Sequence, residues 1–492
     1  MDRRSRRVGV ARLAPKTAPR IALLVALLAA AGCASSGRPA KQAESRPRRT
    51  VLLTSADDVR VGAEAARQVS AEIGLLEDPS LAPYVDGIGK KLLRALPRRE
   101  FAYRFSIVDE MEPNAFALPG GHVYVSRGLL ALANDEDELA CILGHEIVHV
   151  AMRHAAQQQA VARQQNPLAL PVLRQSTLAA YGRDMEREAD AMGQQLCAAV
   201  GYDPAALARF LRRLDQRDRL LIGHPRTATF LDTHPGSGER AAVDAMRASE
   251  LRWHRDESLG DVRRRYLDRI DGLVIGDRPE TGVFLDELFL HPGLGFQIAF
   301  PRGWRVQNTA RAVGASTPRG DAVVFLIGDL PPGDLVEVAE AFATKTQKEH
   351  GVRVVRRQKV RLGELEAVRY RFEGGRGPYG IVAEVTFFPF AGGTWRLVGL
   401  APQAVADRHF GTILASMRSF GPLTEANRAA IELRRLRVVA TRPGEDVAAL
   451  GRRTECTLDP AGTALLNGLL GDEIFAGGEL MKIVHREPDP RP

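Results

Sequence analysis

Long apolar runs and cysteine are both scarce in this chain of 492 residues. The longest apolar run, Ile21 to Ala31, has only eleven residues, whereas a membrane-spanning helix needs about 20. We therefore expect that no segment after residue 32 crosses a membrane. Of the four cysteines, one follows that run, and the other three are Cys141, Cys197 and Cys456. An odd number this small excludes a disulfide framework.

The net positive charge is also small outside the first 32 residues. Those residues contain seven Lys or Arg and one Asp, so they carry six of the eight formal positive charges and leave two for residues 33–492. The pI near 9.5 is therefore a property of the leader, and we expect no nucleic-acid partner. The remaining composition, 45% hydrophobic and 26% charged, is that of a globular protein, and the length predicts two to four domains.

The leader has the three parts of a signal peptide, namely basic residues, a short apolar run and small residues. The run ends at Gly32-Cys33, which resembles the lipobox of bacterial lipoproteins, although Ala30 stands where Leu is usual. The resemblance implies a signal peptide over residues 1–32, lipid attachment at Cys33 and a flexible tether over 33–54. Ala34 resembles the residue that follows the cysteine in lipoproteins sorted to the outer membrane. The alternative is an ordinary secretory leader that ends near a cysteine.

Three folded regions follow in the sequence. Residues 55–275 are mainly helical and contain one strand-like segment, Gly121 to Ser126, which we expect to be a short edge strand. Residues 283–422 alternate with a period of two and predict an α+β domain with an antiparallel sheet. Its first strand weakly resembles PsbP/Mog1-like domains, which implies an accessory role. Residues 436–486 resemble a LysM module, a small βααβ fold that binds N-acetylglucosamine glycans, with Asp446 where Thr is usual. The alternative is a structural cap.

The strongest chemical signal is the motif His145-Glu-Ile-Val-His149. Positions i and i+4 share one face of a helix, so both imidazoles can bind one zinc ion. Glu146 lies about 100° around the helix, where it can act as a general base toward water without binding the metal. The flanking residues are apolar nearly all round, which predicts a buried helix. Asp135 and Glu138 have the spacing of a capping box at its start.

A second helical segment, Arg183 to Asp190, offers two carboxylates at i and i+4, Glu186 and Asp190. Catalytic zinc has three protein ligands and an open position. One of these carboxylates can be the third ligand while the other orients a ligand histidine. A solvated acidic face paired with neighbouring arginines is the alternative for this segment taken alone.

Five segments in the same order resemble the HtpX-like and CAAX-prenyl-protease-type zinc metallopeptidases, gluzincins that include periplasmic BepA-like proteins. They are Asn114 to Gly121, Val123 to Leu130, Gly144 to His149, Glu186 to Asp190, and Thr233 to Pro235 followed by Arg240. The resemblance implies one Zn²⁺ per chain bound by His145, His149 and Glu186, with Glu146 as the base and Asp190 in support.

His234 precedes Pro235, and this position favours extended backbone on a loop that can project into a cleft. Two functional hypotheses stay open. His234 can occupy the fourth zinc position and hold the enzyme latent, or it can stabilise the oxyanion of the reaction together with Arg240. A histidine that only caps the following helix is the third alternative.

Together these features predict a lipid-anchored zinc metalloendopeptidase on the periplasmic face of the outer membrane. Its expected substrates are unfolded or misassembled envelope proteins. Two alternatives stay open: a chaperone or scaffold of envelope assembly with a latent protease site, anchored to peptidoglycan through the LysM-like module, and an enzyme of peptidoglycan maintenance.

Overall fold

The computed structural model describes residues 54–164, 171–220, 230, 234, 237–309, 311–375 and 380–488. The predicted signal peptide, Cys33 and nearly all of the predicted tether lie outside the described residues. The chain forms two compact units. The larger unit contains residues 54–278 together with 429–488, and the smaller unit contains residues 279–428.

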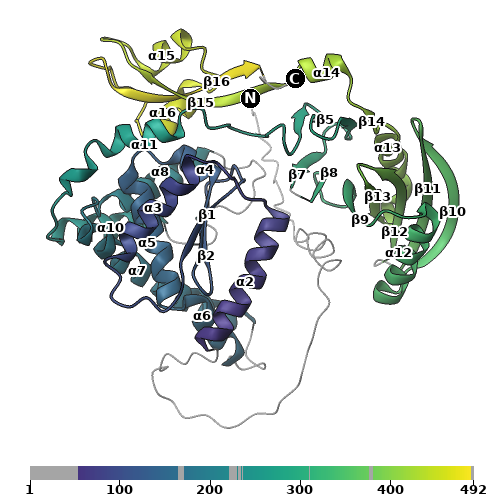
Figure 1. Ribbon diagram of the computed structural model, residues 1–492, viewed down its shortest axis with the longest axis horizontal. Helices are drawn as coiled ribbons and strands as arrows, with labels where there is room; N and C mark the ends of the chain where they lie inside the picture. The colour runs from purple at the N-terminus through teal and green to yellow at the C-terminus, as the bar shows by residue number, and fades with distance from the viewer. Residues whose placement is uncertain are drawn as a thin grey trace, which may run out of the picture. The chain divides into compact units, whose positions relative to one another are not determined.

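The larger unit is mainly helical, and its two sequence segments share one core (Figure 1). Its elements are α2 (Ser55–Glu72), α3 (Leu81–Leu93), β1 (Arg104–Val108), β2 (Ala115–Leu118), β3 (His122–Ser126), α4 (Arg127–Leu132), α5 (Glu136–Ala151), α6 (His154–Gln164), α7 (Pro171–Ala199), α8 (Ala206–Leu220), α10 (Ser237–Glu250), α11 (Val262–Ile270), β15 (Glu432–Ala440), α15 (Val447–Arg453), α16 (Pro460–Asn467) and β16 (Leu480–Pro488). Leu436 of β15 is fully buried in the same core as the residues of α5 and α8, so the carboxy-terminal segment is part of this unit.

The prediction of an edge strand at residues 121–126 is wrong. One sheet of the larger unit has three strands in the order β1-β3-β2, so β3 lies in the middle, and β15 and β16 pair separately. It pairs in parallel with β1 and antiparallel with β2. Four of its five residues are buried, as expected for a central strand that packs on helices. The edge nearest in sequence to the motif helix is therefore β2.

Helix α5 contains the zinc motif and is buried over almost its whole length, as predicted. Asp135 caps the helix, since its carboxylate accepts a hydrogen bond from the Glu138 amide at 2.8 Å. The predicted capping box is only half formed. The Glu138 carboxylate accepts from the amide of Asn134, one residue before the cap, because it is also held by Arg213 through two hydrogen bonds of 2.8 Å.

Helices α5 and α7 lie side by side (Figure 1), and their backbones come close together at two glycines. A Cβ on Gly193 would lie 2.9 Å from the amide nitrogen of His145, and a Cβ on Gly144 would lie 3.1 Å from the carbonyl oxygen of Gly193. The two backbones are therefore in contact beside the zinc motif. This contact fixes the distance between the side chains that the two helices direct toward each other.

The smaller unit is an α+β fold with a seven-stranded antiparallel sheet in the order β10-β11-β12-β13-β9-β8-β7 and a four-stranded sheet in the order β14-β6-β5-β4. Its elements are β4 (Val283–Leu285), β5 (Leu288–His291), β6 (Phe296–Ala299), β7 (Arg305–Asn308), β8 (Ala312–Ser316), β9 (Val323–Leu330), α12 (Leu335–His350), β10 (Arg353–Leu362), β11 (Leu365–Gly374), β12 (Ile381–Phe390), β13 (Gly393–Pro402), α13 (Ala406–Arg418), β14 (Gly421–Pro422) and α14 (Glu425–Ala429). Adjacent residues Phe387 and Phe388 lie in separate cores, one with α12 and the other with α13. Successive residues of a strand point to opposite faces, so the two helices cover opposite faces of the sheet.

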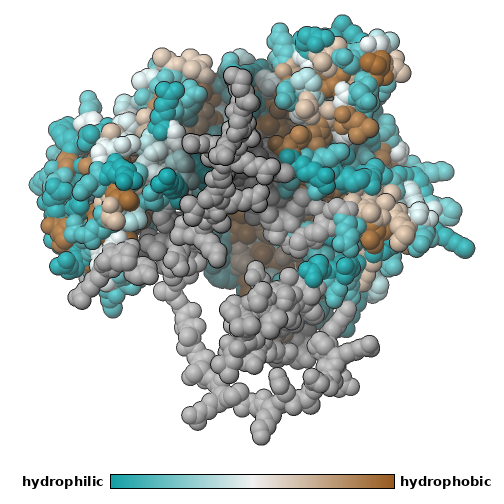
Figure 2. Space-filling view, turned by 180° about the vertical axis from the view of Figure 1, so that it is seen from behind, coloured by the Kyte–Doolittle hydropathy of each residue, from teal (hydrophilic) through white to brown (hydrophobic). Residues whose placement is uncertain are grey.

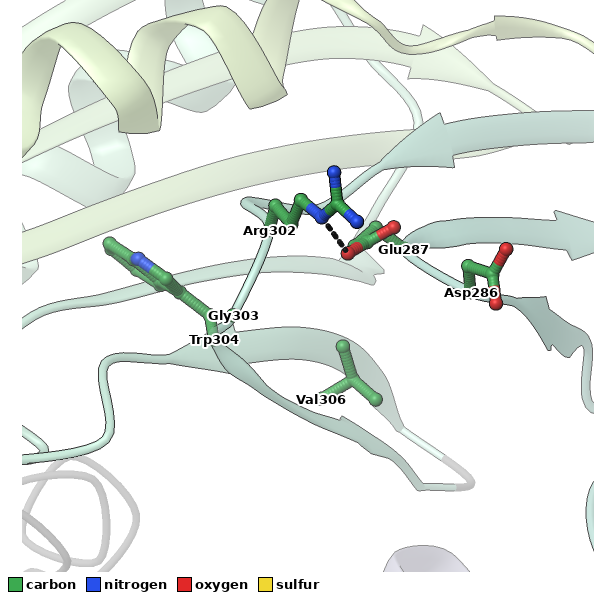
Figure 3. Close-up of a pocket in the computed structure, with 6 residues that line it drawn as sticks. All are labelled: Asp286, Glu287, Arg302, Gly303, Trp304 and Val306. Carbon is green, nitrogen blue, oxygen red and sulfur yellow. Dashed lines mark ion pairs between the residues drawn. The ribbon is translucent and has the colours of Figure 1, made fainter.

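A surface hollow of the smaller unit lies where β7 begins, next to the turn between β4 and β5 (Figure 3). It is lined by Asp286, Glu287, Arg302, Gly303, Trp304 and Val306. This lining contains neither histidine nor cysteine, so the hollow does not offer the donors typical of a zinc site.

On the face shown in Figure 2, hydrophobic residues form small separate groups among hydrophilic ones. Among the described residues, no helix combines the length and the apolar composition needed to span a bilayer.

The glycine contact between α5 and α7 predicts the effect of adding one methyl group. Gly193→Ala should destabilise the fold by about 1–3 kcal/mol, because the new Cβ meets backbone atoms that cannot rotate away. Gly87→Ala, in α3, is the matched control, because nothing lies within 4 Å of its Cβ position. That variant should be neutral or stabilise by about 0.5–1 kcal/mol. Urea unfolding of both variants makes the measurement, and equal stability of the two would contradict the contact.

Candidate metal centre

Four side chains from three parts of the larger unit converge beside the α5–α7 contact. Helix α5 contributes His145 and His149, α7 contributes Glu186, and His234 comes from a position before α10. One ligand atom from each residue lies within 4.8 Å of all the others, and this set could hold a single metal ion. Three of the four side chains are buried, and His149 is partly buried.

The distances among the donor atoms suit a tetrahedral zinc ion. His145 Nε2 lies 2.9 Å from His149 Nε2 and 3.5 Å from Glu186 Oε2. His149 Nε2 lies 3.5 Å from Glu186 Oε1. Ligand atoms around tetrahedral zinc are about 3.3 Å apart, given zinc–nitrogen bonds of about 2.0–2.1 Å. Nitrogen and oxygen donors at these separations, buried and facing one another, fit zinc.

Each ligand histidine is oriented through its second ring nitrogen. His145 Nδ1 lies 2.9 Å from Asp190 Oδ1, and His149 Nδ1 lies 2.9 Å from His154 Nδ1. Such partners fix ring orientation and tautomer in metal sites. His154 lies five residues after His149, but α5 ends at Ala151 and Arg153 has φ of 56°. Helical spacing therefore does not apply between His149 and His154.

Burial and neighbouring charges shift the pKa values of His145 and His149 in opposite directions. Burial lowers the pKa of His145, but the carboxylates of Asp190 and Glu186 outweigh burial and raise it to about 10. Burial and the neighbouring charge of His145 hold the pKa of His149 well below its usual value. Burial would raise the pKa of Glu186, yet His234 and His145 lower it strongly. The carboxylate is thus ionised and His149 is neutral, as metal ligands must be.

Glu146 is buried beside the donors and has no described hydrogen-bond partner. Its side chain is fully buried, and neither carboxylate oxygen accepts a hydrogen bond from the described residues. His234 Nε2 lies 3.5 Å from its Oε1. Burial raises the pKa of Glu146, and His234 and His145 partly offset this rise. A buried carboxylate that accepts no hydrogen bond from the described residues is available to accept a proton from water.

Arg240 holds carboxylates rather than facing open space. Its Nε and Nη2 donate to both oxygens of Asp190 at 2.8 and 2.7 Å, and its Nη1 lies 3.0 Å from Glu186 Oε2. Nη1 also donates to the carbonyl oxygen of His234. The expectation that Arg240 stabilises an oxyanion stays a prediction. The guanidinium is already engaged, and it positions Asp190, Glu186 and the backbone of His234.

His234 points at the donors and is held by an aromatic ring that the sequence did not single out. Its Nδ1 lies 2.8 Å from Glu186 Oε2 and 3.2 Å from His145 Nε2. The ring of Phe230 stacks on the imidazole with centroids 4.3 Å apart. The Phe230 amide donates to the carbonyl oxygen of Pro113, just before β2. No motif marks Phe230, because its role depends on contacts distant in sequence.

Residues 79–246 match the model of peptidase family M48. The matched range contains all four candidate ligands, together with Glu146, Asp190 and Arg240. The part of the larger unit that holds the candidate site is thus similar to the peptidases of family M48.

Two curated relatives resemble the chain over part of its length. One is the beta-barrel assembly-enhancing protease of Yersinia pestis, 28% identical over 261 residues, which are 48% of this chain and 53% of that protein. The other is the mitochondrial metalloendopeptidase OMA1 of Schizosaccharomyces pombe, 29% identical over 198 residues, which are 37% of this chain and 58% of that protein. The chain spans about half the length of these relatives.

Among solved structures, the chain matches cyanobacterial PsbP from Synechocystis with 13% identity and a TM-score of 0.23, over 28% of this chain and 95% of that one. A score this low assigns no fold.

The high pKa of His145 predicts that zinc binding releases protons. At pH 7 the metal-free site holds a proton on His145, and zinc should displace about one proton as it binds. Affinity should therefore rise with pH until about 10, where His145 loses its proton in the metal-free state. Calorimetry in buffers of different ionisation enthalpy measures this release. Asp190→Asn should release fewer protons, and no release from the wild-type protein would contradict the charge assignment.

Proposed function

We propose that this chain, with its M48-type domain, is a zinc metalloendopeptidase of the cell envelope that cleaves misfolded or misassembled envelope proteins. One observation supports the activity above all: His145, His149 and Glu186 converge on one point while the neighbouring Glu146 stays buried and without a described hydrogen-bond partner. A purely structural metal site does not need a buried carboxylate without a hydrogen-bond partner, because the burial of such a group costs free energy.

His145, His149 and Glu186 would hold the metal in the proposed reaction. Bound zinc would act as a Lewis acid that polarises the scissile carbonyl and lowers the pKa of water. Glu146 accepts the proton of the attacking water and passes it to the leaving amine, and burial favours this role because it raises the pKa of the carboxyl. Asp190 keeps His145 in orientation from 2.9 Å, and Arg240 keeps Asp190 in place.

Strand β2 is the place where we propose that the substrate backbone pairs. It is at one end of the β1-β3-β2 sheet, and it packs against α5. An extended peptide that adds to this edge would read backbone rather than side chains. Such recognition suits a protease that acts on many unfolded proteins.

The location of the enzyme is part of the proposal. The lipobox-like Gly32-Cys33 supports lipid attachment at Cys33 and retention on the periplasmic face of the outer membrane. A curated relative is named as an enhancer of beta-barrel assembly, and we propose a comparable class of substrate here. Binding of peptidoglycan by residues 436–486 rests on the LysM resemblance and on the β-α-α-β order of that segment.

A second hypothesis, a chaperone or scaffold with a latent protease site, is supported by the position of His234. Its imidazole lies among the donor atoms, and a zinc site with four protein ligands has no open position. An active protease requires that His234 leave the fourth zinc position, whereas a scaffold with a latent site requires that it stay there. Unchanged function in cells after loss of Glu146 would favour the scaffold.

Glu146→Gln should separate metal binding from proton transfer. The amide keeps the shape of the side chain but cannot accept the proton, so casein cleavage should fall by about 10²-fold or more while zinc is retained. Glu364→Gln, at an exposed position of the smaller unit, is the control and should cleave normally. His149→Ala should lose both zinc and cleavage. Full activity of Glu146→Gln would rule out Glu146 as the base.

His234→Ala tests the latch. If His234 occupies the fourth zinc position, its removal opens that position, and cleavage should increase at unchanged zinc content. If His234 instead stabilises the oxyanion, cleavage should decrease with zinc retained. We expect the increase, because Arg240, the predicted partner in the oxyanion role, is engaged with carboxylates. An unchanged rate would contradict both roles.

A further inference from the structure

A buried lysine from residues 429–488 caps the carboxy-terminal end of helix α4. Lys482 of β16 is fully buried. Its Nζ donates to the carbonyl oxygens of Ala131, Leu132 and Ala133 at 2.7, 3.2 and 2.8 Å. Residues 131 and 132 are the last two of α4, and Ala133 follows them. An ammonium has three N–H donors, so the three acceptors use all of them.

These carbonyls are the ones that a helix leaves without internal partners at its end. They also carry the negative end of the helix dipole, which favours a cation. The arrangement has a cost, since burial lowers the pKa of Lys482 well below its usual value. Among the described residues, no carboxylate forms an ion pair with it. Burial of a cation that only carbonyl oxygens hold costs free energy. We take this cost as a sign that the position of the ammonium matters to the fold around it.

The residues beside these carbonyls lead directly to the zinc helix. Arg213 donates to Leu132 O at 3.2 Å and holds Glu138, in the first turn of α5, through two bonds of 2.8 Å. Arg263 donates to Asn134 O at 3.2 Å and to Leu480 O at 2.9 Å. Strand β16 and the start of α5 are therefore tied through the same polar groups.

The backbone of Lys482 is fixed as firmly as its side chain. Asn467, the last residue of α16, accepts from the Lys482 amide at 2.7 Å and donates to the Lys482 carbonyl at 2.8 Å. Gly468 follows at φ 71°, and a Cβ there would lie 3.0 Å from Arg213 and 3.1 Å from Asn134. Asn467, Gly468 and Lys482 thus tie this segment closely to residues 131–134 and to Arg213.

We propose that Lys482 is a positioning residue of the peptidase, which holds the start of α5 so that His145 and His149 stay aligned with Glu186. His145 lies about two and a half turns into α5, so a shift at the helix start moves both imidazoles. Residues 429–488 are then a built-in part of the catalytic unit. The kinetic part of this inference rests on the proposed function, whereas the metal-binding part does not.

The test compares two full-length variants. Lys482→Met removes the ammonium and keeps an unbranched apolar chain. Val447→Ala is the matched control. It removes two methyl groups from the small hydrophobic core formed within residues 429–488, and Val447 is not among the groups that bind the carbonyl oxygens of residues 131–133. Both should lower Tm. At a temperature where both are folded, Lys482→Met should release zinc to a chelator about fivefold faster or more. Its kcat should fall by a similar factor, with KM within about twofold.

Hydrogen exchange adds a readout that is independent of cleavage. Amides of residues 133–140 should exchange faster in Lys482→Met than in Val447→Ala, while α12 and α13 exchange as in the wild type. Equal zinc release and equal exchange in the two variants would overturn the proposal. If Lys482→Met does not fold, Asn467→Ala serves as a second variant. It keeps the Lys482 ammonium but removes the two hydrogen bonds that hold the backbone of Lys482. It should accelerate zinc release to a smaller extent, and unchanged release would overturn the proposal as well.

If the wild-type protein binds zinc but cleaves nothing, the proposed function fails while zinc release and exchange still decide the role of Lys482.

Discussion

The burial of two imidazoles and a carboxylate on one helix is the constraint on which the rest of the structure depends. Helix α5 is buried on nearly every side, yet it carries His145, Glu146 and His149. Polar groups in such a place destabilise a fold unless partners satisfy them. The fold supplies Glu186 and Asp190 from α7, His154 from beyond the helix end, and Arg240 behind the carboxylates. The glycine contact between α5 and α7 brings these groups within reach.

Much of the fold could be predicted from local patterns. The apolar residues around His145 predicted the buried helix that is present as α5, and the period of two predicted the antiparallel sheet of the smaller unit. The place of β3 in its sheet could not be predicted, because pairing order depends on β1 and β2, which had no comparable signal. That residues 429–488 belong to the larger unit could not be predicted for a similar reason. Lys482 donates to carbonyl oxygens of residues 131–133, which are about 350 residues away in sequence.

The candidate site shows the same division. His145, Glu146, His149 and Glu186 could be named from the sequence because helical spacing and family resemblance determine which side chains share a face. The roles of His154, Phe230 and Arg240 could not. They depend on a helix that ends at Ala151, on a ring stacked across the site, and on a guanidinium that two carboxylates already hold. Spacing predicts ligands, whereas tertiary contacts decide what orients them.

The central claim is that one zinc ion is held jointly by α5 and α7. Metal analysis of the purified wild-type protein beside Glu186→Ala tests it most directly, because Glu186 is the ligand from the second helix. We expect about one zinc per wild-type chain and little or none in Glu186→Ala after dialysis against a weak chelator. Equal zinc in the two proteins, or none in the wild type, would contradict it.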